Sequence, residues 1–197
     1  RTGALRARED VGGRTRTLRF APGNRSLVFV RDDGQLVVFD ATTLTRRLER
    51  ATTGLIAEGF SDDGSAHVHA TATTLTVLRL RGRRSTPIDV ALAGDHRPLD
   101  VVFFEDGARF ALVRSGNTSA EVDALAPAGT IIEVRALRDG TLLGSLEADA
   151  AGIAAGGTEL IACLGGALSA VPIDAEGHVD ASAARALGAC VAGGEID

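Results

Sequence analysis

Two histidines, His67 and His69, stand two positions apart in a run that reads as a β-strand. Side chains at positions i and i+2 of a strand point to the same face, so the two imidazoles could share a metal ion. The sequence fixes no further ligand near this pair. We therefore favour exposed or locally hydrogen-bonded strand histidines, and we expect no metal site and no cofactor.

A second group consists of arginines around a predicted turn. Arg79 is followed by Arg81, Arg83 and Arg84, and guanidinium groups at this density could contact a phosphate or another anion. A solvated basic turn has the same pattern and is the more common outcome. Arg81, Arg83 and Arg84 are the candidate anion-binding residues.

The sequence lacks the short motifs that indicate catalysis directly. It contains no Gly-Xaa-Ser-Xaa-Gly nucleophile elbow, no phosphate-binding Gly-Lys-Ser/Thr loop and no His-Glu-Xaa-Xaa-His pair. The net charge of −5 argues against a nucleic-acid partner. Apolar runs such as Leu27 to Val30 are far shorter than the ~20 residues that cross a bilayer, so we expect no membrane span.

The two cysteines, Cys163 and Cys190, are too few for a disulfide framework or a four-cysteine zinc site. In an exported protein they could pair and close a loop worth about 3 to 4 kcal/mol. In a reducing compartment they would be small buried thiols. The sequence does not determine the compartment. We expect the two thiols to be unpaired, because the segments that carry them are not adjacent strands in the sequence.

An internal repeat supplies the elements that must position these residues. A large apolar residue followed by a short turn ending in glycine occurs at Phe20 to Gly23, Phe60 to Gly64 and Phe104 to Gly107, with the phenylalanines 40 and 44 residues apart. Ala154 to Gly157 is a fainter fourth copy. We expect the three phenylalanines at equivalent positions of successive units.

Short β-rich segments separated by turn residues follow each anchor. Asp32-Asp33-Gly34 and Asp139-Gly140 indicate hairpins, because glycine accepts the positive φ of a tight turn. No long amphipathic helix interrupts the pattern. The predicted strands are Thr15 to Phe20, Ser26 to Arg31, Gln35 to Asp40, Thr45 to Glu49, Gly54 to Phe60, Ser65 to Ala70, Thr74 to Leu80, Ile88 to Leu92, Leu99 to Phe104, Ala108 to Arg114, Thr130 to Leu137, Thr141 to Leu146, Gly152 to Ala155, Glu159 to Leu164 and Ala167 to Ile173, with Ala181 to Leu187 as a short helix or a poor strand.

Several inner strands, such as Leu27 to Val30 and Leu36 to Phe39, are apolar at consecutive positions and so on both faces. An antiparallel sheet with one solvated face would alternate instead. Four-stranded antiparallel units that are covered on both faces can stack around an axis, which is a β-propeller. A β-sandwich is the alternative. We predict an all-β propeller segment over 1–197, with about four blades visible at 15–50, 54–92, 98–147 and 151–189.

The units resemble degenerate blades of the WD40 and YVTN-type β-propeller family. Leu18 to Gly23 followed by Gln35 to Thr43 has the rhythm of such a blade, and Phe39-Asp40 stands in place of its Trp-Asp pair. Gly94-Asp95-His96 is similar to the Gly-His element, with Asp95 inserted. The resemblance implies a ring with more members. We therefore expect further blades of the same chain to complete the ring. The start at Arg1 without an initiator methionine supports the same expectation.

The resemblance also implies where partners bind. In WD40-like propellers the connection between the second and third strands lies on the same rim as the link entering the first strand. The polar insertion Ser115 to Ala128 would then lie near Asp95 and His96, and we take Asp95, His96, Glu121 and Asp123 as candidate partner-binding residues. The predicted function is a non-catalytic protein-interaction scaffold or sensor module. The alternative is a fragment of a propeller enzyme, lactonase-like or quinoprotein-like, whose active site lies partly outside this segment.

Overall fold

The computed structural model describes residues 12–21, 25–52, 54–80, 86–115, 129–149, 154–155 and 157–190. Apart from one three-residue 3-10 turn, η2 (Ala181–Ala183), the regular structure in these ranges is β-strand. The expectation of an all-β chain is therefore confirmed. No helix within the described ranges has the length and apolar character of a membrane-spanning segment.

The strands form four separate sheets, each with four antiparallel strands in chain order. In this respect the sequence prediction is confirmed. The first sheet holds β1 (Thr15–Phe20), β2 (Ser26–Arg31), β3 (Gln35–Asp40) and β4 (Arg46–Ala51), and the second holds β5 (Ala57–Phe60), β6 (Ala66–Ala70), β7 (Thr74–Arg79) and β8 (Ile88–Ala91). The third holds β9 (Arg97–Phe103), β10 (Arg109–Ser115), β11 (Thr130–Ala136) and β12 (Leu142–Ala148), and the fourth holds β13 (Ala154–Ala155), β14 (Glu159–Leu164), β15 (Ala167–Pro172) and β16 (Arg185–Ala189).

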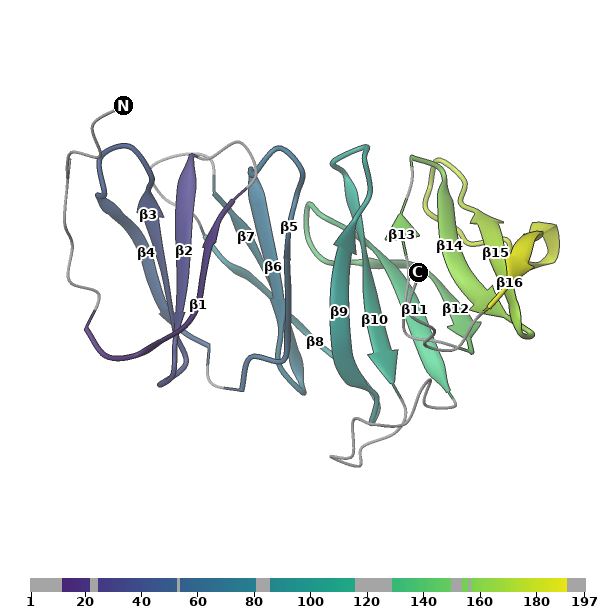
Figure 1. Ribbon diagram of the computed structural model, residues 1–197, viewed down its shortest axis with the longest axis horizontal. Coiled ribbons are helices and arrows are strands. Elements are labelled where there is room, and N and C mark those ends of the chain that lie inside the picture. Colours follow the sequence, from purple (N-terminus) through teal and green to yellow (C-terminus); the bar gives the residue numbers. More distant parts are fainter. Residues whose placement is uncertain are drawn as a thin grey trace, which may run out of the picture.

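The antiparallel order sends the turns of every sheet to two opposite edges of the molecule. We call the edge with the turns between first and second strands and between third and fourth strands the turn rim, which is uppermost in Figure 1. The other edge, the connection rim, carries the turns between second and third strands and the links from one sheet to the next. Residues from different sheets can thus share one rim.

The four sheets pack face to face in the order of the chain. Buried apolar clusters join the first sheet to the second (Val38 with Leu78), the second to the third (Val77 with Phe110) and the third to the fourth (Val134 with Leu160). The first strands of the second, third and fourth sheets also meet, since β9 contacts both β5 and β13. The first and fourth sheets lie at opposite ends of the molecule, so the sheets form an open row (Figure 1).

One expected equivalence is wrong. Phe103 pairs with Phe110 just as Phe60 pairs with His67, so Phe103 and not Phe104 matches Phe60. The repeated segment is therefore Phe60 to Gly64 and Phe103 to Gly107, and the closing glycines have φ values of 64° and 63°. A shift of one residue moves a strand side chain to the other face of its sheet. Phe104 accordingly packs toward the fourth sheet, whereas Phe103 packs toward the second.

The expectation of unpaired cysteines is also wrong. Cys163 in β14 and Cys190, directly after β16, form a disulfide with their Cα atoms 6.0 Å apart. The backbone N–H of Cys190 donates to the carbonyl of Gly166 at a distance of 3.1 Å, in the turn between β14 and β15. The chain leaving β16 thus passes over the end of β15 and reaches β14. The disulfide can link β14 to the chain after β16, although these strands are not neighbours, because it lies beyond the end of β15, the strand between them.

Candidate functional site

A groove of about 780 Å³ lies on the turn rim where three sheets meet. The third sheet supplies most of its lining through the β9–β10 and β11–β12 turns. The second sheet adds the ends of β6 and β7, and the fourth adds the turn after β15. The lining residues are Ser65, Ala66, Arg79, Asp106, Gly107, Ala108, Arg109, Ala136, Leu137, Arg138, Leu143, Ala175 and Glu176.

The Arg109 side chain connects the segments of the third and fourth sheets that lie at this groove. Its guanidinium donates to the Asp106 carboxylate at 2.6 Å, to the Asp174 carbonyl at 2.8 Å and to the Gly157 carbonyl at 3.1 Å. The same group lies 5.2 Å from the centroid of the Phe104 ring. Because its side chain is buried and these bonds join the third sheet to the fourth, Arg109 is a structural residue of the groove.

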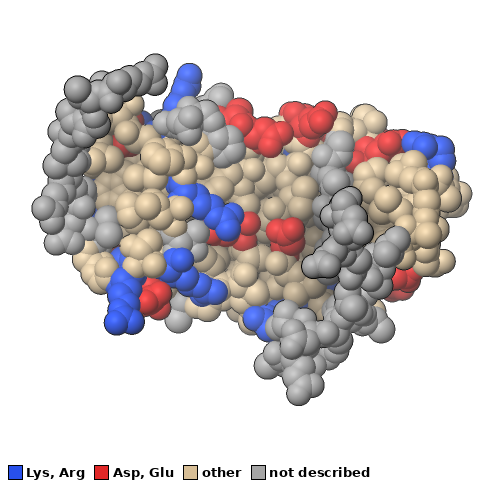
Figure 2. Space-filling model, viewed as in Figure 1, with Lys and Arg blue, Asp and Glu red and all other residues tan. Residues whose placement is uncertain are grey.

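The groove carries charged residues of both signs in and around its lining. Arg79 and Arg138 present exposed guanidinium groups, and the Arg138 side chain is 77% exposed. Acidic side chains gather along the upper edge of the molecule, which is the turn rim (Figure 2). The exposed carboxylates of the β5–β6 and β9–β10 turns are those of Asp62, Asp63, Glu105 and Asp106. Both signs of charge are therefore available to a bound molecule.

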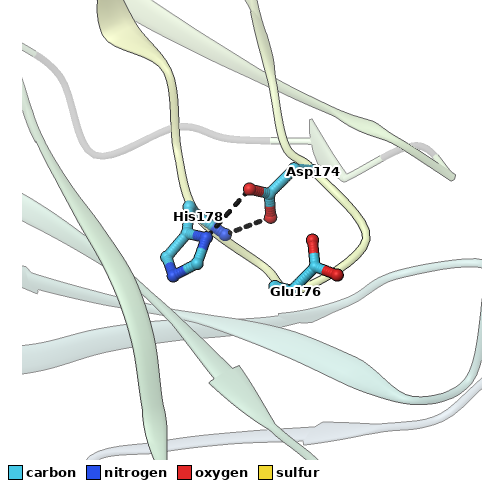
Figure 3. A group of neighbouring side chains, drawn as sticks. All are labelled: Asp174, Glu176 and His178. Carbon is cyan, nitrogen blue, oxygen red and sulfur yellow. Dashed lines mark hydrogen bonds and ion pairs between the residues drawn. The ribbon is translucent and has the colours of Figure 1, made fainter.

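An exposed cluster of Asp174, Glu176 and His178 borders the groove, and all three residues come from the turn after β15 (Figure 3). Each offers a ligand atom within 4.8 Å of the other two. The His178 ring Nδ1 lies 2.8 Å from the Asp174 carboxylate, and the His178 backbone N–H donates to the same carboxylate at 2.8 Å. These bonds lower the pKa of Asp174. The cluster could hold a cation, and its Asp-Xaa-Glu-Xaa-His spacing is the signal in the sequence that could have identified it.

The candidate anion-binding residues are only partly placed. Arg81, Arg83 and Arg84 lie outside the described residues, so their role stays a prediction. Arg79, from the same basic run, ends β7 and lines the groove on the turn rim. The structure thus brings one arginine of that run close to Arg138, which sequence spacing does not associate with it.

Two of the four candidate partner-binding residues, Asp95 and His96, lie on the connection rim. Asp95 is exposed and His96 half-buried in the link between β8 and β9, and Ser115 pairs with both Arg97 and Thr130. The segment between β10 and β11 therefore leaves and re-enters the third sheet beside that link. Glu121 and Asp123 themselves lie outside the described residues, so their place in this patch stays a prediction.

A buried ionic triad supports the link that carries Asp95 and His96. The Glu133 carboxylate accepts from Arg114 at 2.7 Å and from Arg135 at 2.8 Å. Arg114 also donates to the carbonyls of Ala93 and His96, and Arg135 donates to that of Gly140. Because each guanidinium nitrogen of both arginines has an oxygen partner, the triad fixes backbone and does not offer a free charge. Nothing in the sequence indicated it.

The histidine pair is buried between the first two sheets, not exposed. His67 and His69 are 0% and 2% exposed. The His67 Nε2 lies 3.1 Å from a Glu58 carboxylate oxygen, a partner that sequence spacing did not reveal. Burial opposes the charged carboxylate of Glu58, but the hydrogen bond and the charge interaction with His67 outweigh it, so the pKa of Glu58 is lowered.

Comparisons with known proteins extend only to the fold. No family model matches the chain, and no curated protein matches it. Among solved structures, Kuenenia stuttgartiensis hydrazine synthase is similar over 94% of this chain, with a TM-score of 0.54 and 18% sequence identity. The chain spans 52% of the length of that chain. At this identity the likeness shows a shared fold and nothing about activity.

Proposed function

We propose that this chain is a segment of a β-propeller that acts as a non-catalytic protein-interaction scaffold, with the turn rim as its binding surface. The groove shared by three successive sheets carries this proposal. Its lining combines residues that are far apart in the sequence, such as Arg79 and Glu176, so the surface exists only when the sheets stack. Loops displayed on a rigid β scaffold commonly carry recognition.

The repeated geometry supports the propeller part of the proposal. Every sheet has the same strand order, and the first strands of the second, third and fourth sheets lie side by side, as strands do near a propeller axis. Phe60 and Phe103 are each packed against the preceding sheet, whereas the matching Phe20 is 59% exposed and its neighbour Leu18 is 55% exposed. A further blade of the same chain in front of the first sheet would cover them.

The charges favour a partner segment that carries both signs. An acidic group of the partner would meet Arg79 and Arg138 in the groove, and basic groups would meet the carboxylates of the β5–β6 and β9–β10 turns. The connection-rim patch of Asp95, His96, Glu121 and Asp123 is the alternative contact surface, for a cationic partner, and a test that compares the two rims decides between them. The sensor role and the propeller-enzyme alternative rest on analogy alone.

Site-specific photocrosslinking tests the choice of rim. A photoreactive residue at position 138, on the turn rim, should capture a partner protein in an extract of the source organism. The same residue at position 97, on the connection rim, is the control. With the captured partner purified, the double change Arg79→Glu and Arg138→Glu should weaken binding by about ten-fold or more, while Arg97→Glu leaves it unchanged. Loss of affinity only with Arg97→Glu would move the surface to the connection rim, and equal affinities for all variants would refute a rim surface.

A further inference from the structure

We infer that Glu58, His67 and His69 form a binding site for a divalent transition-metal ion, with Zn²⁺ as the best match, inside the interface between the first and second sheets. The three residues come from neighbouring strands, β5 and β6, and Glu58 is the cross-strand partner of His69. All three side chains point away from the cluster that joins the second sheet to the third. They face the first sheet instead.

The internal repeat shows that apolar side chains can fill the positions of these three residues. The strand registers give each of them equivalents in the other sheets. The positions that match His67 hold Leu27, Phe110 and Leu160, those that match His69 hold Phe29, Leu112 and Ala162, and those that match Glu58 hold Leu18 and Val101. Apolar side chains occupy every matched position. Since burying polar groups opposes folding, two buried histidines beside a half-buried glutamate at one interface point to a ligand.

The histidine rings have unused ligand atoms. The Nδ1 atoms of His67 and His69 are buried, and neither has a hydrogen-bond partner among the described residues. Buried ring nitrogens in proteins are normally paired, so two orphans in adjacent rings are unusual. Turning the His69 ring breaks no hydrogen bond at its Nδ1, and rotation about the Cβ–Cγ bond is a soft torsion. A metal can therefore recruit this nitrogen at low cost.

The distances suit tetrahedral zinc. The His67 Nε2 and Glu58 Oε2 atoms are 3.1 Å apart, and two ligand atoms on tetrahedral zinc are about 3.3 Å apart. The ring centroids of His67 and His69 are 5.5 Å apart, close to the separation of about 5.2 Å for two imidazoles on one tetrahedral ion. Without metal, the three ligand atoms do not yet lie within 4.8 Å of one another. Metal binding at these residues therefore requires the His69 ring to turn toward His67 and Glu58.

The residue types also match the metal. Imidazole and carboxylate together are the ligand set of many zinc sites.

The exposed Asp174, Glu176 and His178 cluster is the natural control, because it offers the same ligand types on the surface. The test uses the untagged chain and isothermal titration with Zn²⁺ alone, followed by the visible absorption of the Co²⁺ complex. His69→Leu and Glu58→Gln remove interface ligands, and His178→Gln removes the surface histidine. Leucine is an apolar residue of the kind that the other sheets carry at this position, so His69→Leu should fold, which circular dichroism checks.

One Zn²⁺ per chain should bind. Affinity should fall by about 100-fold in His69→Leu and by about 10-fold in Glu58→Gln, with no change in His178→Gln. The Co²⁺ spectrum should show the intense bands of a four-coordinate ion in the original chain and lose them in His69→Leu. Binding that is lost in His178→Gln but kept in His69→Leu would overturn the inference by placing the metal on the surface cluster. Absence of Zn²⁺ binding in the original chain would also overturn it.

Discussion

Gly59 of β5 lies directly against Val101 of β9: a β-carbon on Gly59 would be 2.6 Å from the Val101 carbonyl oxygen. That separation is far below van der Waals contact, and the obstacle is backbone, which cannot swing aside. β5 and β9 are the first strands of the second and third sheets. The absent side chain at Gly59 therefore sets how closely these two sheets approach each other.

Gly59→Ala should destabilise the chain by about 1 to 3 kcal/mol, because the added methyl group pushes two packed strands apart. Gly188→Ala in β16 is the matched control, since a β-carbon there has no atom within 4 Å. The control should be neutral or slightly stabilising through reduced freedom of the unfolded chain. Urea unfolding of both variants measures the difference, and similar stabilities would contradict the close approach.

The isolated chain should self-associate through the outer face of its first sheet. Leu18 and Phe20 are more than half exposed there, side by side on β1, and such apolar surface seeks a partner. Leu18→Ser together with Phe20→Ser should give a monomer in light scattering at concentrations where the original chain forms larger species. Leu142→Ser, at a leucine that is 49% exposed in β12, should not. A monomeric original chain would contradict the prediction.

The disulfide should stabilise the fourth sheet. Cys163 and Cys190 are 27 positions apart, and closing a loop of that length is worth about 3.5 kcal/mol in the chain-entropy account. Cys163→Ala should lower the stability by a similar amount and abolish the effect of a reducing agent on the melting temperature. If reductant shifts the melting temperature of both proteins equally, the bond does not contribute.

Stability should fall as the pH falls from about 6.5 toward 3, and His69 should account for part of the loss. Its pKa is near 6.5 when unfolded and about 3 when folded, so between these values the unfolded chain binds more protons. The loss attributable to His69 is about 3 kcal/mol at pH 4. The groups that interact with His69 are His67, Arg50, Glu58 and Asp89.

Urea unfolding at pH 7 and pH 4, in the presence of EDTA, measures this loss. His69→Leu should lose less stability than the original chain over the same interval, because its leucine cannot take up a proton. Carboxylates that do not interact with His69 titrate alike in both proteins and cancel in the comparison. Equal losses in the two proteins would show that His69 does not titrate as the structure indicates.

Strand positions and turns could be predicted from the sequence because they depend on the conformational preferences of neighbouring residues. Runs such as Gln35 to Asp40 are β-rich over their whole length, and glycines at Gly64 and Gly107 mark turns that need positive φ. The apolar residues on both faces of several strands also predicted that other sheets pack against both faces of a sheet. These features require only neighbours in the chain.

The candidate sites were decided by the tertiary structure. Glu58 meets His67 through strand register, and one residue of register separates Phe103 from Phe104 without changing the local pattern. The groove joins Arg79 to Glu176, and the disulfide joins Cys163 to Cys190, only because stacked sheets and a crossing chain end bring them together. Sequence periodicity reports which side of a strand is buried, but not which strand faces it, and that pairing determines the chemistry.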